Sequence, residues 1–438
     1  MPPIRWLGDV IPKERLKELE PSLAEVEVIS RPSAPLCLTC RGGRMLCGKI
    51  RCPLILKAQS LVKKRALMDS LRIEGSTPPA VFVGRVGYPQ VYIGPMVPPY
   101  HGSTEILDTP EMWLGKPVEE IVDYRYSLIR GKVRAHVNDA SFRSRVLDTL
   151  QELAMSLRSV ESEVELWKKP KGVLTLSDEV QPFGPSAPLK SFKAGSISVD
   201  RRIEKAYYDK DLKAVDAVWA LYKDGVLITR IQRTFSLGMF GSTRRLVPTR
   251  WSITAVDSII SSCLIEQLKG FDTIDEYRVY KFKSLGSIYV AILMPEKWSF
   301  EWIEAWFPGT TWNPEKGSKP ALMGDYEGYR GRSEYPDIGG CYFSARLAVA
   351  EALMRERRQS SALLMREIHP EHVLPLGVWS VRESIRAMLS KPPELYDGFE
   401  RALHEAMKAL TIPLREWIVH SRIIRRARFQ RRITEFVK

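Results

Sequence analysis

The 438-residue sequence lacks a long hydrophobic run. Its longest apolar stretch, 287–294, is far shorter than the ~20 residues that a membrane-spanning helix requires. The opening segment MPPIRWLGDV has proline, arginine and aspartate where a secretory signal peptide would have its apolar core. We therefore expect an intracellular, cytoplasmic protein that has no membrane partner.

The signatures of common hydrolases are also missing. The sequence has six histidines, and His369-Pro-Glu-His372 differs from the HExxH motif of zinc proteases because a proline interrupts the helix that this motif needs. There is no GxSxG nucleophile elbow, and no run of paired carboxylates typical of a Mg2+-dependent nuclease. The sequence therefore does not support a zinc peptidase, a serine hydrolase or such a nuclease.

Acidic residues are too few to balance the basic ones. The chain has 66 Lys and Arg against 52 Asp and Glu, a net charge of +14. Residues 421–438 alone carry +6, from seven basic residues and one acid. Such an excess favours polyanionic partners, above all nucleic acids.

The pattern of apolar residues predicts a mixed α/β (α+β) protein without internal repeats. We expect four regions: a lead-in, a four-cysteine zinc module and a basic helix over 1–75; a first α/β domain over 76–270; a second α/β domain over 271–420; and a flexible basic tail over 421–438.

The coarse secondary structure follows from hydrophobic periodicity and turn residues. Strands are predicted at 80–83, 90–93, 277–282, 287–293, 362–368 and 377–381. Helices are predicted within 109–130 and 141–167, and at 54–72, 255–268, 298–306, 345–358, 383–390 and 398–410. The turn Lys223-Asp224-Gly225 predicts a β-hairpin over 214–230.

Cysteine is scarce but clustered. Four of the six cysteines lie within 16 residues, at Cys37, Cys40, Cys47 and Cys52. In an intracellular chain such clustering favours a metal over disulfides. Four thiolates complete the tetrahedron that Zn2+ prefers and leave no open position, so we expect a structural zinc site. A [4Fe–4S] cluster, which four thiolates also hold, is the alternative.

The last residues form a possible docking peptide. Gln430, Ile433 and Phe436 are spaced as in the PIP box, the peptide that binds the sliding clamp PCNA, although Val437 stands where a second aromatic residue is usual. One turn of tight helix would place the two apolar side chains together as a plug. The alternative is a terminal helix that packs Ile433 and Phe436 onto the body.

Two loops carry residues suited to phosphate or nucleic-acid binding. Segment 235–251 is rich in glycine, and Arg233 lies just before it. The candidate residues for binding phosphate are Arg233, Ser242, Thr243, Arg244, Arg245 and Arg250. Glycines let backbone N–H groups approach a phosphate, and arginines bind it bidentately. The turn 84–88, with Arg85, Tyr92 and Tyr100, could stack a base. Ordinary surface loops and core aromatics are the alternatives.

One enzymatic hypothesis rests on 339–344 and the following helix and strand. This stretch is similar to part of the NAD-binding core of ADP-ribosyltransferases. In that interpretation Tyr342 stacks on the nicotinamide, and Glu383 (or Glu367) is the catalytic carboxylate. Ordinary sheet core with an amphipathic helix is the alternative.

Several segments together resemble the archaeal Nre family of DNA repair proteins (NreA type). They are the cysteine cluster, the terminal peptide, VFVGRVGYP (81–89) with VYIGP (91–95), FSLGMFGSTRRLVPTRW (235–251), YPDIGGCYF (335–343) and GVWSVRE (377–383). The resemblance implies repair of DNA damage, PCNA binding through the terminal peptide and an archaeal cytoplasm. It implies no particular reaction.

The sequence thus predicts a DNA repair factor that PCNA recruits and that binds DNA through a basic surface. Two alternatives stay open. One is an NAD-dependent, ADP-ribosyltransferase-like or other DNA-modifying enzyme, and the other is an RNA-associated zinc protein.

Overall fold

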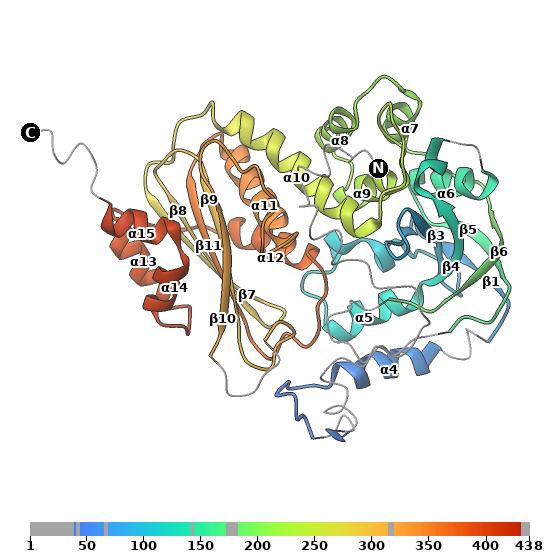
Figure 1. Ribbon diagram of the computed structural model, residues 1–438, viewed down its shortest axis with the longest axis horizontal. Helices are drawn as coiled ribbons and strands as arrows, with labels where there is room; N and C mark the ends of the chain where they lie inside the picture. Colours follow the sequence, from blue (N-terminus) through green and yellow to red (C-terminus); the bar gives the residue numbers. More distant parts are fainter. Residues whose placement is uncertain are drawn as a thin grey trace, which may run out of the picture. The chain divides into compact units, whose positions relative to one another are not determined.

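The computed structural model describes residues 39–40, 44–64, 69–141, 144–171, 183–313 and 319–430. They fall into two compact units. The first unit contains Cys52–Ile260, and the second contains Thr39–Arg51 and the chain from Ser261 onward. The division falls inside helix α10 (Thr249–Leu268), and Figure 1 shows strands and helices in both units. The predicted mixed α/β class is confirmed.

The described strands of the first unit form a six-stranded sheet. Their order is β1 (Arg72–Thr77), β5 (Val160–Leu166), β6 (Ser186–Ala194), β4 (Ile129–His136), β3 (Gln90–Val97) and β2 (Val81–Val83). Neighbours are antiparallel except for the parallel pair β4–β6. Buried and more exposed residues alternate along β5, as expected where only one face of a sheet is covered.

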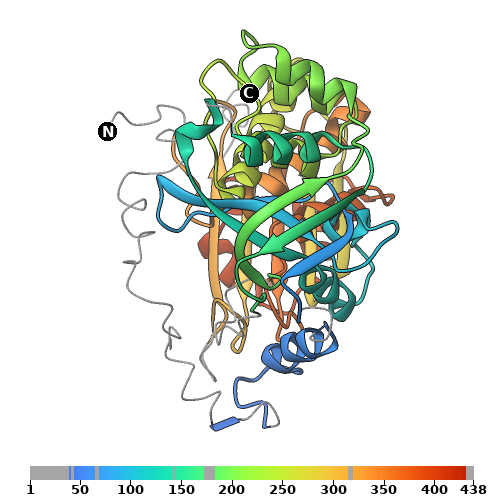
Figure 2. The ribbon, with the colours of Figure 1, turned by 90° about the vertical axis from the view of Figure 1, so that its right-hand side faces the viewer.

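Helices cover one face of this sheet. Helix α6 (Arg145–Met155) packs on β2, β3 and β6, and α9 (Ile228–Ser236) packs on β2. The remaining described helices of this unit are α4 (Pro53–Lys64), α5 (Val118–Ser127), α7 (Arg201–Tyr208) and α8 (Ala214–Lys223). In Figure 2, among the described segments, no helix lies in front of the other sheet face.

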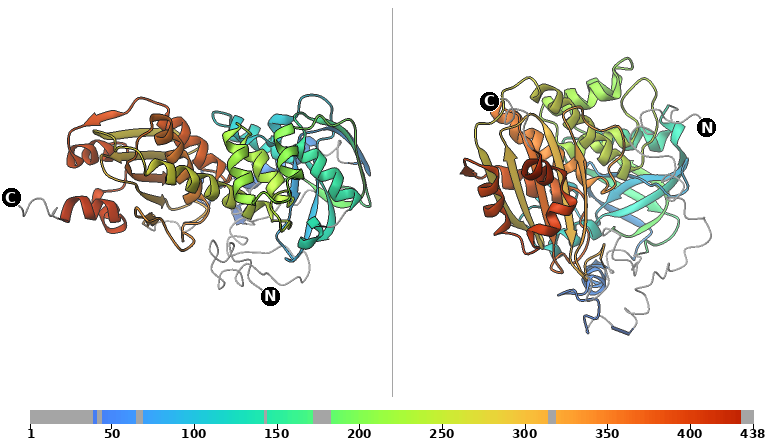
Figure 3. Two further views of the ribbon diagram at one scale, coloured as in Figure 1. Left: turned by 90° about the horizontal axis from the view of Figure 1, so that it is seen from above. Right: turned by 60° about the vertical axis from the view of Figure 1, so that its left-hand side comes forward.

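The second unit has its own six-stranded sheet among the described residues. The order is β10 (Ala321–Glu327), β9 (Ser299–Trp306), β11 (Ser361–Ile368), β8 (Ser287–Met294), β7 (Tyr277–Ser284) and β12 (Glu394–Tyr396). Helices α11 (Cys341–Glu356) and α12 (Trp379–Leu389) lie on one face (Figure 1; Figure 3). Helices α13 (Phe399–Met407), α14 (Leu414–His420) and α15 (Arg422–Phe429) lie on the other.

This two-sided cover explains why β9 and β11 are buried along their whole length. The face toward α13–α15 packs Val290, Ile303 and Leu363 against Trp417 and Ile423. Each such side chain contributes about 1.5–3 kcal/mol through burial. None of the described helices is long and apolar enough to cross a membrane.

Several predicted elements are confirmed, and three are wrong. Helices α10 and α11 and strands β2, β3, β7, β8 and β11 match the predicted segments. The predicted hairpin over 214–230 is instead the helix pair α8–α9. Gly225, with φ +75°, ends α8 as a C-cap: Val226 N–H donates to the Leu221 carbonyl and Gly225 N–H to the Tyr222 carbonyl. A glycine with positive φ occurs both in hairpin turns and at the C-terminal ends of helices, so the turn residues alone did not distinguish the two structures.

The predicted helix over 298–306 is strand β9. Trp302 and Trp306 do share a face, but residues four apart share a face in a strand as well as in a helix. The segment 377–381, predicted as a strand, leads into α12. Within the predicted helical stretches 109–130 and 141–167, helices α5 and α6 are followed by strands β4 and β5.

The tail is shorter than predicted. Residues 422–429 form α15, whose Ile423 and Ile424 are fully buried. The Glu301 carboxylate on β9 accepts hydrogen bonds from Ser421 Oγ at 2.5 Å and from Ile423 N–H at 3.0 Å, and so caps this helix. The body therefore extends to Phe429, and the residues after Gln430 lie outside the described part of the chain.

Candidate nucleic-acid interface

Two loops of the first unit meet at one place. The first, 84–89, joins β2 to β3, and the second, 237–248, joins α9 to α10. Val83 N–H donates to Thr249 Oγ1 at 2.9 Å, which links the end of β2 to the start of α10. The rings of Tyr88 and Trp251 are in contact, with centroids 5.1 Å apart. Sequence segments about 160 residues apart thus build one surface.

Glycine makes both loops possible. Gly87 has φ +84° and Gly238 has φ +64°, a backbone conformation that other residues adopt only with strain. A Cβ atom on Gly238 would also lie 2.5 Å from the Arg245 carbonyl oxygen. This close approach fixes the path of the second loop and the place where Arg245 leaves it.

Three arginines gather around the aromatic pair. We define the loop cluster as Arg85, Tyr88, Arg245, Arg250 and Trp251. Burial and the nearby charge of Arg250 lower the pKa of Arg85, and burial raises the pKa of Tyr88 while the charge of Arg245 opposes this rise. Within the described residues, no carboxylate forms an ion pair with these three arginines.

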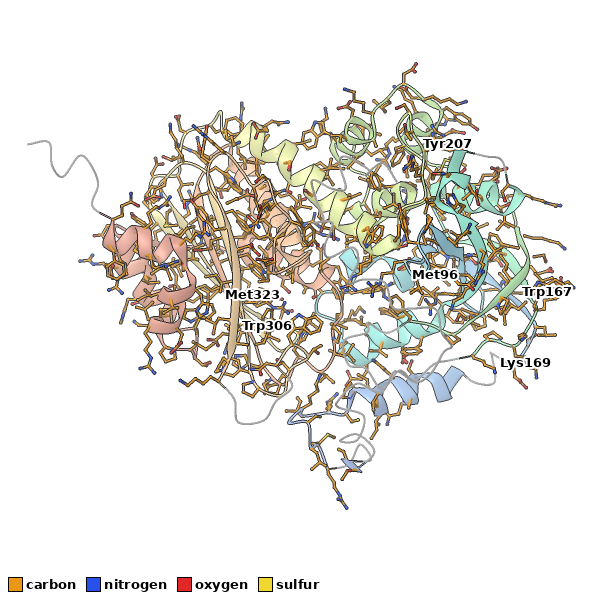
Figure 4. The ribbon with its side chains drawn as sticks, viewed as in Figure 1. Met96, Trp167, Lys169, Tyr207, Trp306 and Met323 are labelled. Carbon is orange, nitrogen blue, oxygen red and sulfur yellow. The ribbon has the colours of Figure 1, made fainter. Side chains whose placement is uncertain are left out.

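The other predicted residues of the second loop have different surroundings. Ser242 and Thr243 are exposed at its tip. Arg244 lies over the ring of Tyr207, 4.8 Å from its centroid, and donates to the Tyr207 carbonyl (Figure 4 labels Tyr207). Arg233 is buried on α9, where it forms an ion pair of 2.5 Å with Asp108 and donates to the Pro79 carbonyl. Its contacts are those of a residue that holds the fold together.

The sequence patterns did not indicate that Tyr88 and Trp251 are partners, nor that β4 carries a row of cations. Arg130, Lys132 and Arg134 alternate along a segment whose first residue was assigned to a predicted helix. Their spacing of two was the available signal, because it puts all three on one face of a strand. Of the residues proposed for the first loop, Tyr92 lies on that same sheet, and Tyr100 is half-buried near Ser127.

The four cysteines of the predicted metal site are only partly described. Cys37 lies outside the described residues; Cys40 is buried and accepts a hydrogen bond from Leu46 N–H at 3.4 Å, and Cys47 and Cys52 are half-buried. No group of three or more metal-ligating side chains comes together within the described ranges. Segment 44–51 belongs to the second unit, where Lys49 Nζ donates to the Val373 carbonyl at 2.9 Å.

Of the predicted clamp-binding residues, Gln430 is described and exposed at the end of α15. Ile433, Phe436 and Val437 lie outside the described residues. The proposed clamp contact therefore stays a prediction.

Tyr342 and Glu383 have separate surroundings in the second unit. The ring of Tyr342 is buried between Phe300 and Phe343, with centroids at 5.1 and 5.7 Å. Glu383 accepts hydrogen bonds from Arg382 and Arg386 at 3.1 and 3.0 Å. Glu367 points to the opposite sheet face, where it accepts from the N–H groups of residues 411 and 412.

Comparison with known proteins gives consistent matches. The model of the archaeal Nre N-terminal domain matches residues 46–313, and that of the archaeal Nre C-terminal domain matches residues 327–436. The chain is 44% identical to DNA repair protein NreB of Archaeoglobus fulgidus over 404 residues, which cover 92% of this chain and 100% of the relative.

Two further relatives are similar over most of their length. DNA repair protein NreA of the same organism is 37% identical over 87% of this chain and 95% of its own. DNA repair protein NreA of Haloferax volcanii is 34% identical over 78% of this chain and 83% of its own. No solved structure matches the chain.

Proposed function

The chain belongs to the archaeal Nre family, and from this premise we propose that it is a DNA repair factor that binds DNA through the loop cluster. Relatives named as DNA repair proteins support the first part of this proposal. The second part rests on one observation, the gathering of three arginines and two aromatic rings on the two glycine-containing loops and the first turn of α10.

The physical reason is electrostatic. Like charges that lie close together repel, and the nearby charge of Arg250 helps to lower the pKa of Arg85. A bound polyanion relieves this repulsion, and guanidinium groups bind phosphate oxygens bidentately. Phosphate contacts of this kind supply most of the sequence-independent affinity for DNA.

The proposal is tested by fluorescence anisotropy with a labelled DNA duplex, using the full chain. We expect Arg250→Gln and Arg85→Gln each to weaken binding about tenfold, because a hydrogen bond to a charged group contributes about 1.5–3 kcal/mol. Each lost phosphate contact lowers the slope of log affinity against log salt by about 0.9. Arg278→Gln is the control, because Arg278 on β7 is ion-paired with Glu356 at 2.6 Å. Equal affinities for all four proteins would contradict the proposal.

We also propose that the terminal peptide recruits the chain to PCNA. Its spacing of Gln430, Ile433 and Phe436 supports this, as does its position directly after a packed helix. Attachment to a clamp on DNA raises the local concentration of the loop cluster, so weak DNA contacts suffice. A pulldown with purified clamp compares the full chain with one that ends at Phe429. Equal retention of both would contradict clamp docking by this peptide.

Finally, we propose that Cys37, Cys40, Cys47 and Cys52 bind one structural zinc ion, with a [4Fe–4S] cluster as the alternative. The four closely spaced thiols and the N–H···S bond to Cys40 support this. Elemental analysis of the purified chain is expected to find about one zinc per molecule. Cys47→Ser should lose it and Cys263→Ser should keep it. A brown protein that absorbs near ~400 nm would favour the iron–sulfur alternative.

A further inference from the structure

One face of the first sheet has no helix over it among the described residues, and this face carries a row of cations and aromatic rings. Tyr92 on β3 lies opposite Arg134 on β4 in the strand register. Arg130 and Lys132 precede Arg134 at alternate positions, so all three point to the same face. Helices α6 and α9 occupy the other side of the sheet. We call this surface the basic sheet half; its residues are Phe82, Tyr92, Arg130, Lys132, Arg134 and Phe183.

The two halves of this face differ in how their cations are neutralised. Toward β1 and β5, every strand cation that we compare has an acidic partner: Arg72 binds Glu163 at 2.7 Å, and Lys190 binds Glu165 at 2.6 Å. In the basic sheet half, none of the three cations forms an ion pair with a carboxylate of the described residues. An external anion can therefore pair with these cations, of which Arg130 also donates to the Gly184 carbonyl oxygen at 3.1 Å.

The cations of the basic sheet half also crowd one another. Burial lowers the pKa of Arg130 to about 10, and burial together with the charge of Arg130 lowers the pKa of Lys132. Both effects disfavour the charged forms when the face is empty. An anion on this face would reverse them.

Each aromatic ring here lies against a guanidinium group. Arg134 lies over Tyr92, 5.6 Å from the ring centroid, and donates to its hydroxyl at 3.2 Å. Arg130 lies 5.6 Å from the centroid of Phe82 and 5.0 Å from that of Phe183. Phe183 remains 47% exposed. The contacts hold flat π surfaces and charges in fixed positions, so little side-chain entropy is lost when a partner binds.

Glycine keeps the middle of this surface low. A Cβ atom on Gly94 would overlap the carbonyl oxygen of Gly131 on β4 and would lie 3.3 Å from Cε1 of Phe82. The ring of Phe82 therefore lies close over β3 instead of standing away from it.

We propose that the basic sheet half binds single-stranded DNA, with phosphates on Arg130, Lys132 and Arg134 and bases stacked on the aromatic rings. This inference rests on the proposed DNA-binding function. Stacking requires free base faces, which a single strand exposes and a duplex conceals. The cations compared near β1 and β5 are already paired with carboxylates, so phosphates favour β2, β3 and β4, a width of about 10 Å.

The test compares a labelled 12-mer of thymidine with a duplex of the same length, by anisotropy at several salt concentrations. We expect Tyr92→Ala to weaken single-strand binding about tenfold, the loss typical of one stacked base. Arg134→Gln should weaken it and lower the salt slope by about 0.7. The matched control is Arg72→Gln, because Arg72 is an exposed strand cation that is already ion-paired. Thermal melting of every variant verifies the fold.

The outcomes separate this inference from the function on which it rests. If the duplex binds and depends on Arg250, but Tyr92→Ala and Arg134→Gln bind the single strand like the wild type, the sheet proposal is wrong and the loop cluster stands. If neither nucleic acid binds, both proposals are wrong. If a 12-mer of uridine binds more tightly than the thymidine 12-mer, RNA and not DNA is the ligand of this face, and the proposal is overturned.

Discussion

The two sheets of this protein have the same number of described strands and one parallel pair each, but the partners of their charged side chains differ. Within the described part of the chain, the first sheet has one face without a covering helix, and the cations of β4 on that face have no acidic partner. The second sheet is covered on both faces, and its charged residues bind one another inside the unit. A charge on a covered sheet stabilises the fold, whereas a charge on an open sheet can serve a partner.

The charges of the second sheet are placed by strand register. Arg366 on β11 is the neighbour of Glu304 on β9 and of Tyr289 on β8. Arg366 and Glu304 are both buried and form an ion pair of 2.8 Å. On the opposite face, Glu301 and Glu367 accept hydrogen bonds from backbone N–H groups near the ends of helices. Burial of an ionised group is tolerated only with such partners.

The largest effect is expected from breaking the buried pair. Arg366→Leu leaves Glu304 without its cation in the interior and should lower the free energy of unfolding by about 3–5 kcal/mol. Urea unfolding measures it, and Arg134→Leu on the open sheet is the matched control. A double variant that also carries Glu304→Leu should recover part of the loss. Equal stability of the two single variants would contradict the contrast between the sheets.

A smaller loss is expected at the cap of α15. Glu301→Ala leaves the Ser421 hydroxyl and the N–H groups of Arg422 and Ile423 without their acceptor, at a cost of about 1–3 kcal/mol. Hydrogen exchange should show faster opening of 421–429 than of α11. Uniform exchange across the second unit would mean that the cap does not hold the last helix.

The third prediction concerns pH. Burial, together with the charge of Arg366, lowers the pKa of His372 to about 3, so the folded chain keeps this imidazole neutral. The unfolded chain takes up the proton near pH 6.5. Stability from this group is therefore complete above about pH 6.5 and declines as the pH falls toward 3.

Between pH 7 and 5.5, the wild type should lose about 1 kcal/mol more than His372→Gln in urea unfolding. His420→Gln, at an exposed position, should follow the wild type. If His372→Gln has the same pH dependence as the wild type, the neutral buried imidazole does not govern this range.

The smallest effect is expected on the open sheet. Lys190→Gln removes an ion pair of 2.6 Å with Glu165 between partly exposed side chains, and should change the free energy of unfolding by about 0–1 kcal/mol. Its Nζ also lies 5.5 Å from the ring centroid of Trp167, which Figure 4 labels. The difference in the free energy of unfolding between Lys190→Gln and the wild type, measured by urea unfolding, should be smaller at high salt than at low salt. A loss as large as that of Arg366→Leu would remove the distinction between the two sheets.

Local patterns were sufficient for some elements and for part of the candidate site. The apolar run of β8 was readable because its length and its uninterrupted apolar character are those of a buried strand. Arg245 and Arg250 were found from their glycine-rich loop. The pairing of Tyr88 with Trp251 was not, because contact between distant segments depends on the sheet and helices that carry them. The row on β4 was missed because its alternating side chains are charged rather than apolar.

By itself, the sequence determined the family, the excess of positive charge and the mixed α/β class, because these depend on composition and on local order along the chain. Only the tertiary structure determined which arginines form ion pairs and hydrogen bonds inside the protein. Arg233 and Arg250 come from the same basic segment, but Arg233 is buried against Asp108 and Arg250 is exposed. Whether a cation can meet a partner is a matter of which elements cover it, and the linear spacing of residues does not contain that information.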